Sequence, residues 1–88
     1  MIPIQDLLHR IRWDPEFGNA SFEVAYLDKV TGELVRVPFK QLRMEPGEHF
    51  GFELTGLHGE TLFIPYHRVR EVYRNGKLIW QRPEPPAS

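Results

Sequence analysis

A group of basic side chains near the C-terminal end is the part of the sequence that most suggests chemistry. His67, Arg68 and Arg70 follow a proline in the stretch IPYHRVREVYRNGKLIW, and an Asn-Gly pair marks a tight hairpin directly after them. Arginine offers forked donors that suit phosphate oxygens, and histidine adds a titratable donor. Because such side chains would be held on rigid strands, this stretch predicts a preorganised anion-binding corner. The alternative is an ordinary solvated strand face.

Two tryptophans with charged neighbours offer surfaces for stacking. Arg12, Trp13 and Asp14 follow one another at the end of a predicted helix, and Trp80 and Arg82 share one face of the last predicted strand. Either Trp could stack on a base, and the arginines could meet phosphate. Asp14 could orient Arg12 or a histidine. The alternative is that both tryptophans close the core and that Asp14 belongs to a turn.

The charges are divided along the chain, although the formal net charge is only −1. Residues 64–82 contain five Arg or Lys and one Glu, whereas residues 44–63 contain four Glu and neither Arg nor Lys. A net charge near zero argues against non-specific binding of polyanions. Because the positive charge lies in residues 64–82, we expect an anion to bind in this stretch and not in residues 44–63.

Motifs for metal binding and for nucleophilic catalysis are missing. The chain has no cysteine, and its four histidines lack the spacing of a metal site. No nucleophile elbow or phosphate-binding glycine loop is present. We therefore expect no metal and no cofactor. An acid–base pair of His67 with Asp14 or His9 is conceivable, but nothing in the sequence brings these groups together.

The length of the chain limits its organisation. We expect a single domain over residues 1–82, followed by a disordered Pro-rich tail at 83–88. No apolar run reaches the roughly 20 residues that cross a bilayer, and the N-terminal stretch lacks a signal-peptide pattern. The sequence therefore predicts a soluble, cytoplasmic protein without a membrane partner.

Hydrophobic periodicity predicts one helix and about six strands. The helix is expected at about residues 3–12, from apolar residues at helical spacing. The strands are expected within 21–28, 33–39, 50–54, 61–65, 69–74 and 77–82. The predicted fold class is α+β, with the short N-terminal helix packed on antiparallel strands that form a curled sheet or small barrel.

One short pattern occurs twice. VPFKQLR (37–43) and IPYHRVR (64–70) share the order aliphatic, Pro, aromatic, basic, polar, aliphatic, Arg. Both follow a predicted strand. The repetition predicts that the chain leaves a strand, crosses a corner and begins a new strand with the same geometry at both places.

These motifs resemble the RNA cyclic group end recognition domain, a small archaeal and bacterial family. The similarity runs from about Leu8 to Arg82 and is carried by IRWDP, FEVAYLDKVTGELVRVPF and above all IPYHRVREVYRNGKLIWQR. The resemblance implies a module that recognises RNA 3′ ends bearing a 2′,3′-cyclic phosphate and supports RNA processing or repair. It implies substrate-binding roles for Arg12, Trp13, Asp14, His67, Arg68, Arg70, Trp80 and Arg82.

The functional hypothesis is a non-catalytic RNA-binding module, with RNA ligase or phosphodiesterase proteins as possible partners. His67, Arg68 and Arg70 would grip the phosphate, and Trp13 or Trp80 would stack on the terminal base. Two alternatives stay open. One is a small RNA phosphodiesterase or processing enzyme that uses His67, and the other is a protein–protein adaptor without a role in RNA binding.

Overall fold

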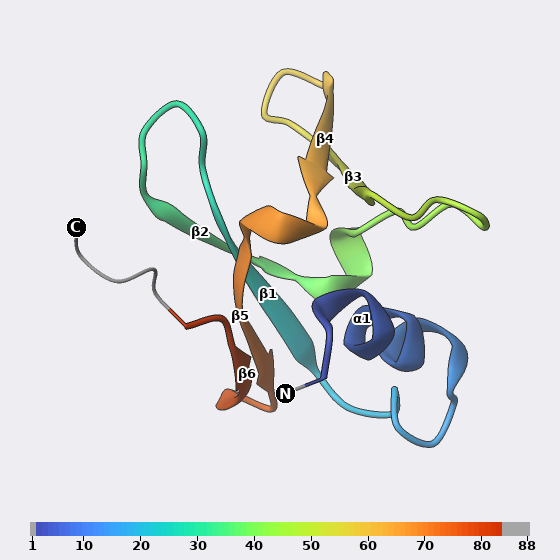
Figure 1. The fold of residues 1–88 in the computed structure, drawn as a ribbon. Coiled ribbons are helices and arrows are strands. Elements are labelled where there is room, and N and C mark those ends of the chain that lie inside the picture. The colour runs from blue at the N-terminus through green and yellow to red at the C-terminus, as the bar shows by residue number, and fades with distance from the viewer. Residues whose placement is uncertain (1, 84–88) are drawn as a thin grey trace.

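The computed structural model describes residues 2–83 and has the predicted α+β composition of one helix and six strands (Figure 1). Its elements are α1 (Ile4–Trp13), β1 (Phe22–Leu27), β2 (Leu34–Pro38), the 3-10 turn η1 (Phe39–Gln41), β3 (Gly51–Thr55), β4 (Thr61–Pro65), the 3-10 turn η2 (Tyr66–Arg68), β5 (Val69–Arg74) and β6 (Lys77–Gln81). Of the tail predicted at 83–88, only Pro83 is among the described residues. Within 2–83, no helix is long and apolar enough to span a membrane.

The strands form two separate antiparallel sheets. The larger sheet has the order β2-β1-β5-β6, and β3 pairs with β4 in a two-stranded ribbon. Consecutive strands pair as the hairpins β1–β2, β3–β4 and β5–β6, and the last of these confirms the hairpin predicted at Asn75-Gly76. In the described chain no closed barrel forms, because β3 and β4 pair with no strand of the larger sheet. Pro38 ends β2 and Pro65 ends β4, and a 3-10 turn follows each proline.

The helix places its apolar side on the core. Its buried residues are Ile4, Leu7, Leu8 and Ile11. They pack in one cluster with buried side chains from both sheets, among them Val24, Phe52 and Val72. The helix lies one residue later than predicted, because Pro3 stands outside it at the N-cap position.

The two repeated stretches build the same corner, as predicted. Pro38 and Pro65 have nearly identical backbone angles, with φ −62° and ψ 140° at the first and φ −63° and ψ 145° at the second. A single 3-10 turn follows each proline and buries its first residue, Phe39 in η1 and Tyr66 in η2. The burial of this aromatic residue fixes both corners to the core.

The start of β3 lies against the second corner. The carbonyl oxygen of Phe50 accepts a hydrogen bond from the N–H of Tyr66 at 2.8 Å, one residue pair beyond the Gly51–Pro65 pair of the ribbon. Only glycine fits at position 51. A Cβ added there would collide with the carbonyl oxygen of Ile64 and would lie 2.8 Å from the Cα of Pro65. This glycine therefore allows the close approach that holds Phe50 beside η2.

We expect Gly51→Ala to lower the free energy of unfolding by about 1–3 kcal/mol, the usual cost of forcing atoms into an occupied space. Urea denaturation followed by circular dichroism measures the effect. Thr61→Ala, at an exposed position in the same ribbon, is the control and should change stability much less. Equal stability of Gly51→Ala and the wild type would show that the ribbon does not approach the corner so closely.

Candidate functional site

A β-bulge in the larger sheet sets the direction of the Arg70 side chain. Ala25 of β1 lies opposite Glu71, but the next residue, Tyr26, lies opposite Val69. Arg70 is therefore the extra residue of a β-bulge, a device that redirects a side chain. Its Nη1 donates a hydrogen bond to the carbonyl oxygen of His67 at 2.8 Å.

Arg82 meets the same corner from the neighbouring strand. Its backbone N–H donates to the carbonyl oxygen of Arg70 at 2.8 Å, so the two arginines lie next to one another on adjoining chain segments. The Arg82 side chain donates from Nε to the carbonyl oxygen of Val69 at 3.0 Å and from Nη2 to that of Tyr66 at 3.3 Å. Both guanidinium groups therefore bind carbonyl oxygens of one short segment, residues 66–69.

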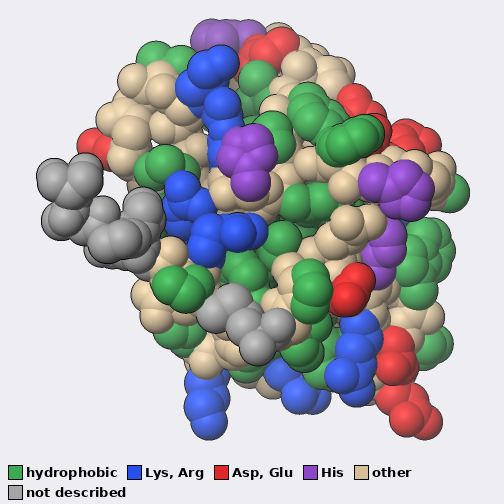
Figure 2. All heavy atoms as spheres, viewed as in Figure 1, with side chains coloured by type: hydrophobic (Ala, Val, Ile, Leu, Met, Phe, Trp, Pro, Cys, Tyr) green, Lys and Arg blue, Asp and Glu red, His purple; other side chains and the backbone are tan. Residues whose placement is uncertain are grey.

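This arrangement concentrates positive charge at a partly buried place. Burial lowers the pKa of Arg82, and the nearby charge of Arg70 lowers it further. The ion pairs between described residues include neither arginine. Figure 2 shows Lys, Arg and His side chains gathered near the middle of the face on which Figure 1 draws η2. Two adjacent, half-buried cations of this kind would gain from binding an anion.

The other two members of the predicted basic group differ in position. His67 is exposed on η2, and its carbonyl oxygen is the acceptor for Arg70. Arg68 lines a different hollow of about 190 Å³, together with Asp28 and Phe63. The pKa of Asp28 is lowered mainly by hydrogen bonds from the backbone N–H groups of residues 31 and 30, and only weakly by Arg68. Arg68 therefore lines a hollow that includes neither Arg70 nor Arg82.

The residues predicted near the N-terminal end form a separate local structure. The Asp14 carboxylate accepts hydrogen bonds from the backbone N–H groups of Glu16 and Phe17 and lies 3.8 Å from Arg10. The hypothesis that Asp14 orients Arg12 or a histidine is therefore wrong. Arg12 lies over the ring of Trp13 instead, with 5.6 Å between its Cζ and the ring centroid. Figure 1 shows this end of α1 and the loop after it on the side of the helix away from η2.

The two tryptophans have opposite environments. Trp13 is 60% exposed, whereas Trp80 is 7% exposed and belongs to the core. The Nε1 of Trp80 donates to the carbonyl oxygen of Ile2 at 2.8 Å, and Arg82 lies over its ring at 5.3 Å. The expectation of base stacking on Trp80 is therefore wrong, because its ring is already packed. Its position in the core matches the alternative stated for it.

A groove beside the arginine pair was not foreseen. It has a volume of about 320 Å³ and lies between the beginning of α1 and the end of β6. Its lining residues are Ile2, Pro3, Ile4, Gln5, His49, Tyr66, Trp80 and Arg82. Gln5 Nε2 and His49 Nδ1 are 3.3 Å apart in a hydrogen bond across it. Neither residue belongs to a recognisable motif. They are 44 positions apart in the sequence, so their proximity was not predictable from it.

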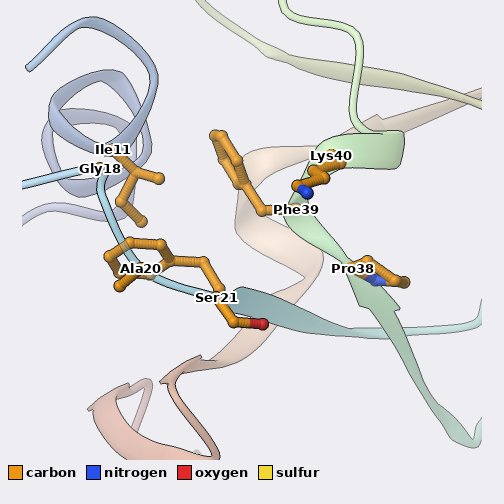
Figure 3. A pocket seen from close by; sticks show the side chains of 8 residues that line it. Ile11, Gly18, Ala20, Ser21, Pro38, Phe39 and Lys40 are labelled. Atoms are coloured by element: carbon orange, nitrogen blue, oxygen red, sulfur yellow. The ribbon is translucent and has the colours of Figure 1, made fainter. Parts of the chain in front are cut away.

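Another hollow lies at the first corner, between the loop after α1 and η1 (Figure 3). Its volume is about 270 Å³, and Lys40 is the charged residue in its lining. The remaining lining residues are Ile11, Gly18, Ala20, Ser21, Phe22, Pro38 and Phe39. This mostly apolar surface offers fewer polar contacts to an anion than the corner at η2.

The comparisons with known proteins agree with the resemblance seen in the sequence. The family model described as the MJ1316 RNA cyclic group end recognition domain matches residues 1–82. A UPF0248 protein of Metallosphaera sedula is 29% identical over 79 residues, which cover 90% of this chain and 91% of the relative. No solved structure gives a significant match.

The burial of the two tryptophans is directly testable by fluorescence. In a Trp13→Phe variant, the remaining emission of Trp80 should be blue-shifted and poorly quenched by acrylamide, because its ring is in the core. In the wild type, the exposed Trp13 should add a red-shifted component that acrylamide quenches readily. A Trp13→Phe protein with readily quenched emission and an unchanged melting temperature would contradict the core position of Trp80.

Proposed function

The chain belongs to the MJ1316 RNA cyclic group end recognition domain family, and from this membership we propose that it binds RNA 3′ ends that carry a 2′,3′-cyclic phosphate. In this proposal the protein is a binding module and not an enzyme. It would present such ends to RNA-processing or repair proteins, such as a ligase or a phosphodiesterase, in the cytoplasm.

The observation that carries the proposal is the convergence of Arg70 and Arg82 on η2. A guanidinium group has about five N–H donors. Arg70 uses its side chain for one carbonyl oxygen and Arg82 for two, so both keep donors for a ligand. A cyclic phosphate has two non-bridging oxygens and a single negative charge. Two adjacent forked donors suit these oxygens in number and in charge.

The carbonyl contacts also make the site rigid before the ligand arrives. A long arginine side chain loses up to about 2 kcal/mol of rotamer entropy when it is ordered. Here the hydrogen bonds to residues 66–69 have already ordered both side chains. The exposed ring of His67 stands on the same turn and would add a third donor.

We do not propose that the remaining predicted site residues bind the terminal phosphate. Arg68 lines the hollow near Asp28, where it would meet RNA beyond the terminal nucleotide. Arg12 and Trp13 lie at the far end of α1, so we do not assign them to the RNA end. Asp14 is occupied by the turn that it stabilises, and Trp80 supports the corner from within the core.

Titration of the protein with one short RNA carrying three alternative ends tests the proposal. We expect the order of affinity 2′,3′-cyclic phosphate, then 3′-phosphate, then 3′-hydroxyl, with NMR shifts centred on residues 66–70 and 82. Arg70→Gln and Arg82→Gln should each weaken binding of the cyclic end about 10- to 100-fold, the cost of losing a hydrogen bond from a charged donor. The matched control is Arg43→Gln, which changes the equivalent residue of the first corner and should bind normally.

Three results would reject parts of this proposal. Equal binding of all three ends, or no binding, would remove RNA-end recognition and favour a role as a protein adaptor. Conversion of the cyclic phosphate to a monophosphate, lost in His67→Ala, would make the protein an enzyme. Normal binding by both arginine variants would move the phosphate away from η2. Thermal melts of each variant separate loss of binding from loss of folding.

The salt dependence of binding should be shallow. A protein that contacts one or two phosphates of a single strand should show a slope of log affinity against log salt of about −0.7 to −1.4. Measuring the affinity for the cyclic end between low and moderate salt concentrations gives this slope. A much steeper slope would indicate an extended contact with the RNA backbone and would argue against end recognition.

A further inference from the structure

We propose that Glu71 selects RNA ends by the charge of their phosphate, so that a phosphate with one negative charge binds better than one with two. The inference rests on the proposed function, because it takes the phosphate to be bound by Arg70 and Arg82. It adds the residue that separates a cyclic phosphate, which is a diester with a single charge, from a 3′-phosphate, which is a monoester and carries up to two charges.

A small hollow on the larger sheet contains both arginines and the Glu71 side chain. Its lining residues are Leu27, Leu34, Arg70, Glu71, Gln81 and Arg82. Its volume is about 150 Å³, which is below the range of about 300–1,000 Å³ for pockets that hold whole small molecules. The hollow therefore suits a phosphate group and not a complete nucleotide.

Strand pairing fixes the other lining residues around the two arginines. Glu71 of β5 lies directly opposite Gln81 of β6, and Leu27 of β1 lies directly opposite Leu34 of β2. Residues that are directly opposite one another in an antiparallel pair point to the same face of the sheet. The place of the carboxylate beside the arginines is therefore set by the backbone of the sheet and not by a flexible loop.

A hydrogen bond, and not a cation, holds the Glu71 carboxylate. The Tyr73 hydroxyl donates to its Oε1 at 2.8 Å, and this bond is the first cause of the raised pKa of Tyr73. Arg36 lies over the Tyr73 ring, with 3.7 Å between its Cζ and the ring centroid, but its charge is paired with Glu23 at 2.8 Å. The ion pairs between residues 2 and 83 do not include Glu71. Its negative charge therefore acts on whatever the hollow contains.

The charges that line the hollow match a monoanion. Two guanidinium groups and one carboxylate leave a single positive unit. The attraction of an anion grows in proportion to its charge, whereas the cost of removing it from water grows with the square of the charge. One positive unit therefore compensates one negative charge, but it leaves the second charge of a dianion unpaired in a partly buried place.

The walls of the hollow strengthen this selection. Leu27 and Leu34 present apolar side chains, and apolar surroundings reduce the screening of charges by water. Without the Glu71 carboxylate, the same walls would enclose two positive units and would suit a dianion better. The carboxylate thus weakens the binding of every anion a little, and it weakens the binding of a dianion most.

The experiment measures the affinity of three RNAs that differ only at the 3′ end. The ends are a 2′,3′-cyclic phosphate, a 3′-phosphate and a 3′-methylphosphate, which is a diester with one charge and no ring. At about pH 8 the 3′-phosphate carries two charges, because the second pKa of a phosphate monoester is about 6. In the wild type, the affinity of the methylphosphate end should be closer to that of the cyclic end than to that of the 3′-phosphate.

Exchanging Glu71 and Gln81 separates charge from position. Glu71→Gln should reduce the preference for the cyclic end over the 3′-phosphate about 3- to 30-fold, the range for removing one unit charge from a partly buried site. Gln81→Glu adds a carboxylate at the opposing position and should increase the preference. The double variant Glu71→Gln/Gln81→Glu keeps the net charge of the hollow, so it should restore most of the wild-type preference. Glu23→Gln removes a carboxylate that does not line the hollow and should change the preference much less.

Two results would overturn the inference while the proposed function stands, provided that the wild type prefers the cyclic end. One is an unchanged preference in Glu71→Gln, or a double variant that still behaves like Glu71→Gln. The other is a methylphosphate end that binds as weakly as the 3′-phosphate, because the protein would then recognise the ring and not the charge. If the wild type does not distinguish the cyclic end from the 3′-hydroxyl, the proposed function itself fails. Thermal melts of each variant separate altered binding from altered folding.

Discussion

The chain passes from the two-stranded ribbon into the larger sheet through the corner at residues 65–69, and the burial of Tyr66 holds this corner in place. Pro65 ends β4 and stiffens the entry to the turn, while Val69 is already part of β5 and of the core. The turn leaves carbonyl oxygens at Tyr66, His67 and Val69 that accept hydrogen bonds from arginine side chains. The positions of Arg70 and Arg82 both follow from this corner.

Arg70 and Arg82 stabilise the turn, and in the proposed function the same side chains also bind the ligand. A hydrogen bond from a charged donor contributes about 1.5–3 kcal/mol, so their contacts with the turn help to stabilise the fold. The same contacts bring two like charges together at a half-buried place, which is unfavourable for the protein alone. An anion relieves this repulsion. The arrangement can thus be stable enough to fold and still gain from a ligand.

Much of the fold was predictable from local patterns. The helix, the six strands and the shared corner geometry follow from apolar spacing, turn residues and the repeated Pro-aromatic pattern. The site was predictable only in part. Arg70 was found because basic residues cluster in its stretch, but alternation alone does not show that it is a bulge residue. Burial of Trp80 depends on contacts between distant segments, and so does the place of Glu71 beside Arg82 in one hollow.

The hydrogen bond between Trp80 and Ile2 has a consequence for how the molecule opens. It joins residues 78 positions apart, and contacts over such long separations carry a high entropic cost of loop closure during folding. The segment before α1 contributes few other buried side chains, since Ile2 and Pro3 are exposed. We expect the backbone at Ile2 to exchange its amide hydrogen through local opening and not through global unfolding, because few contacts hold it.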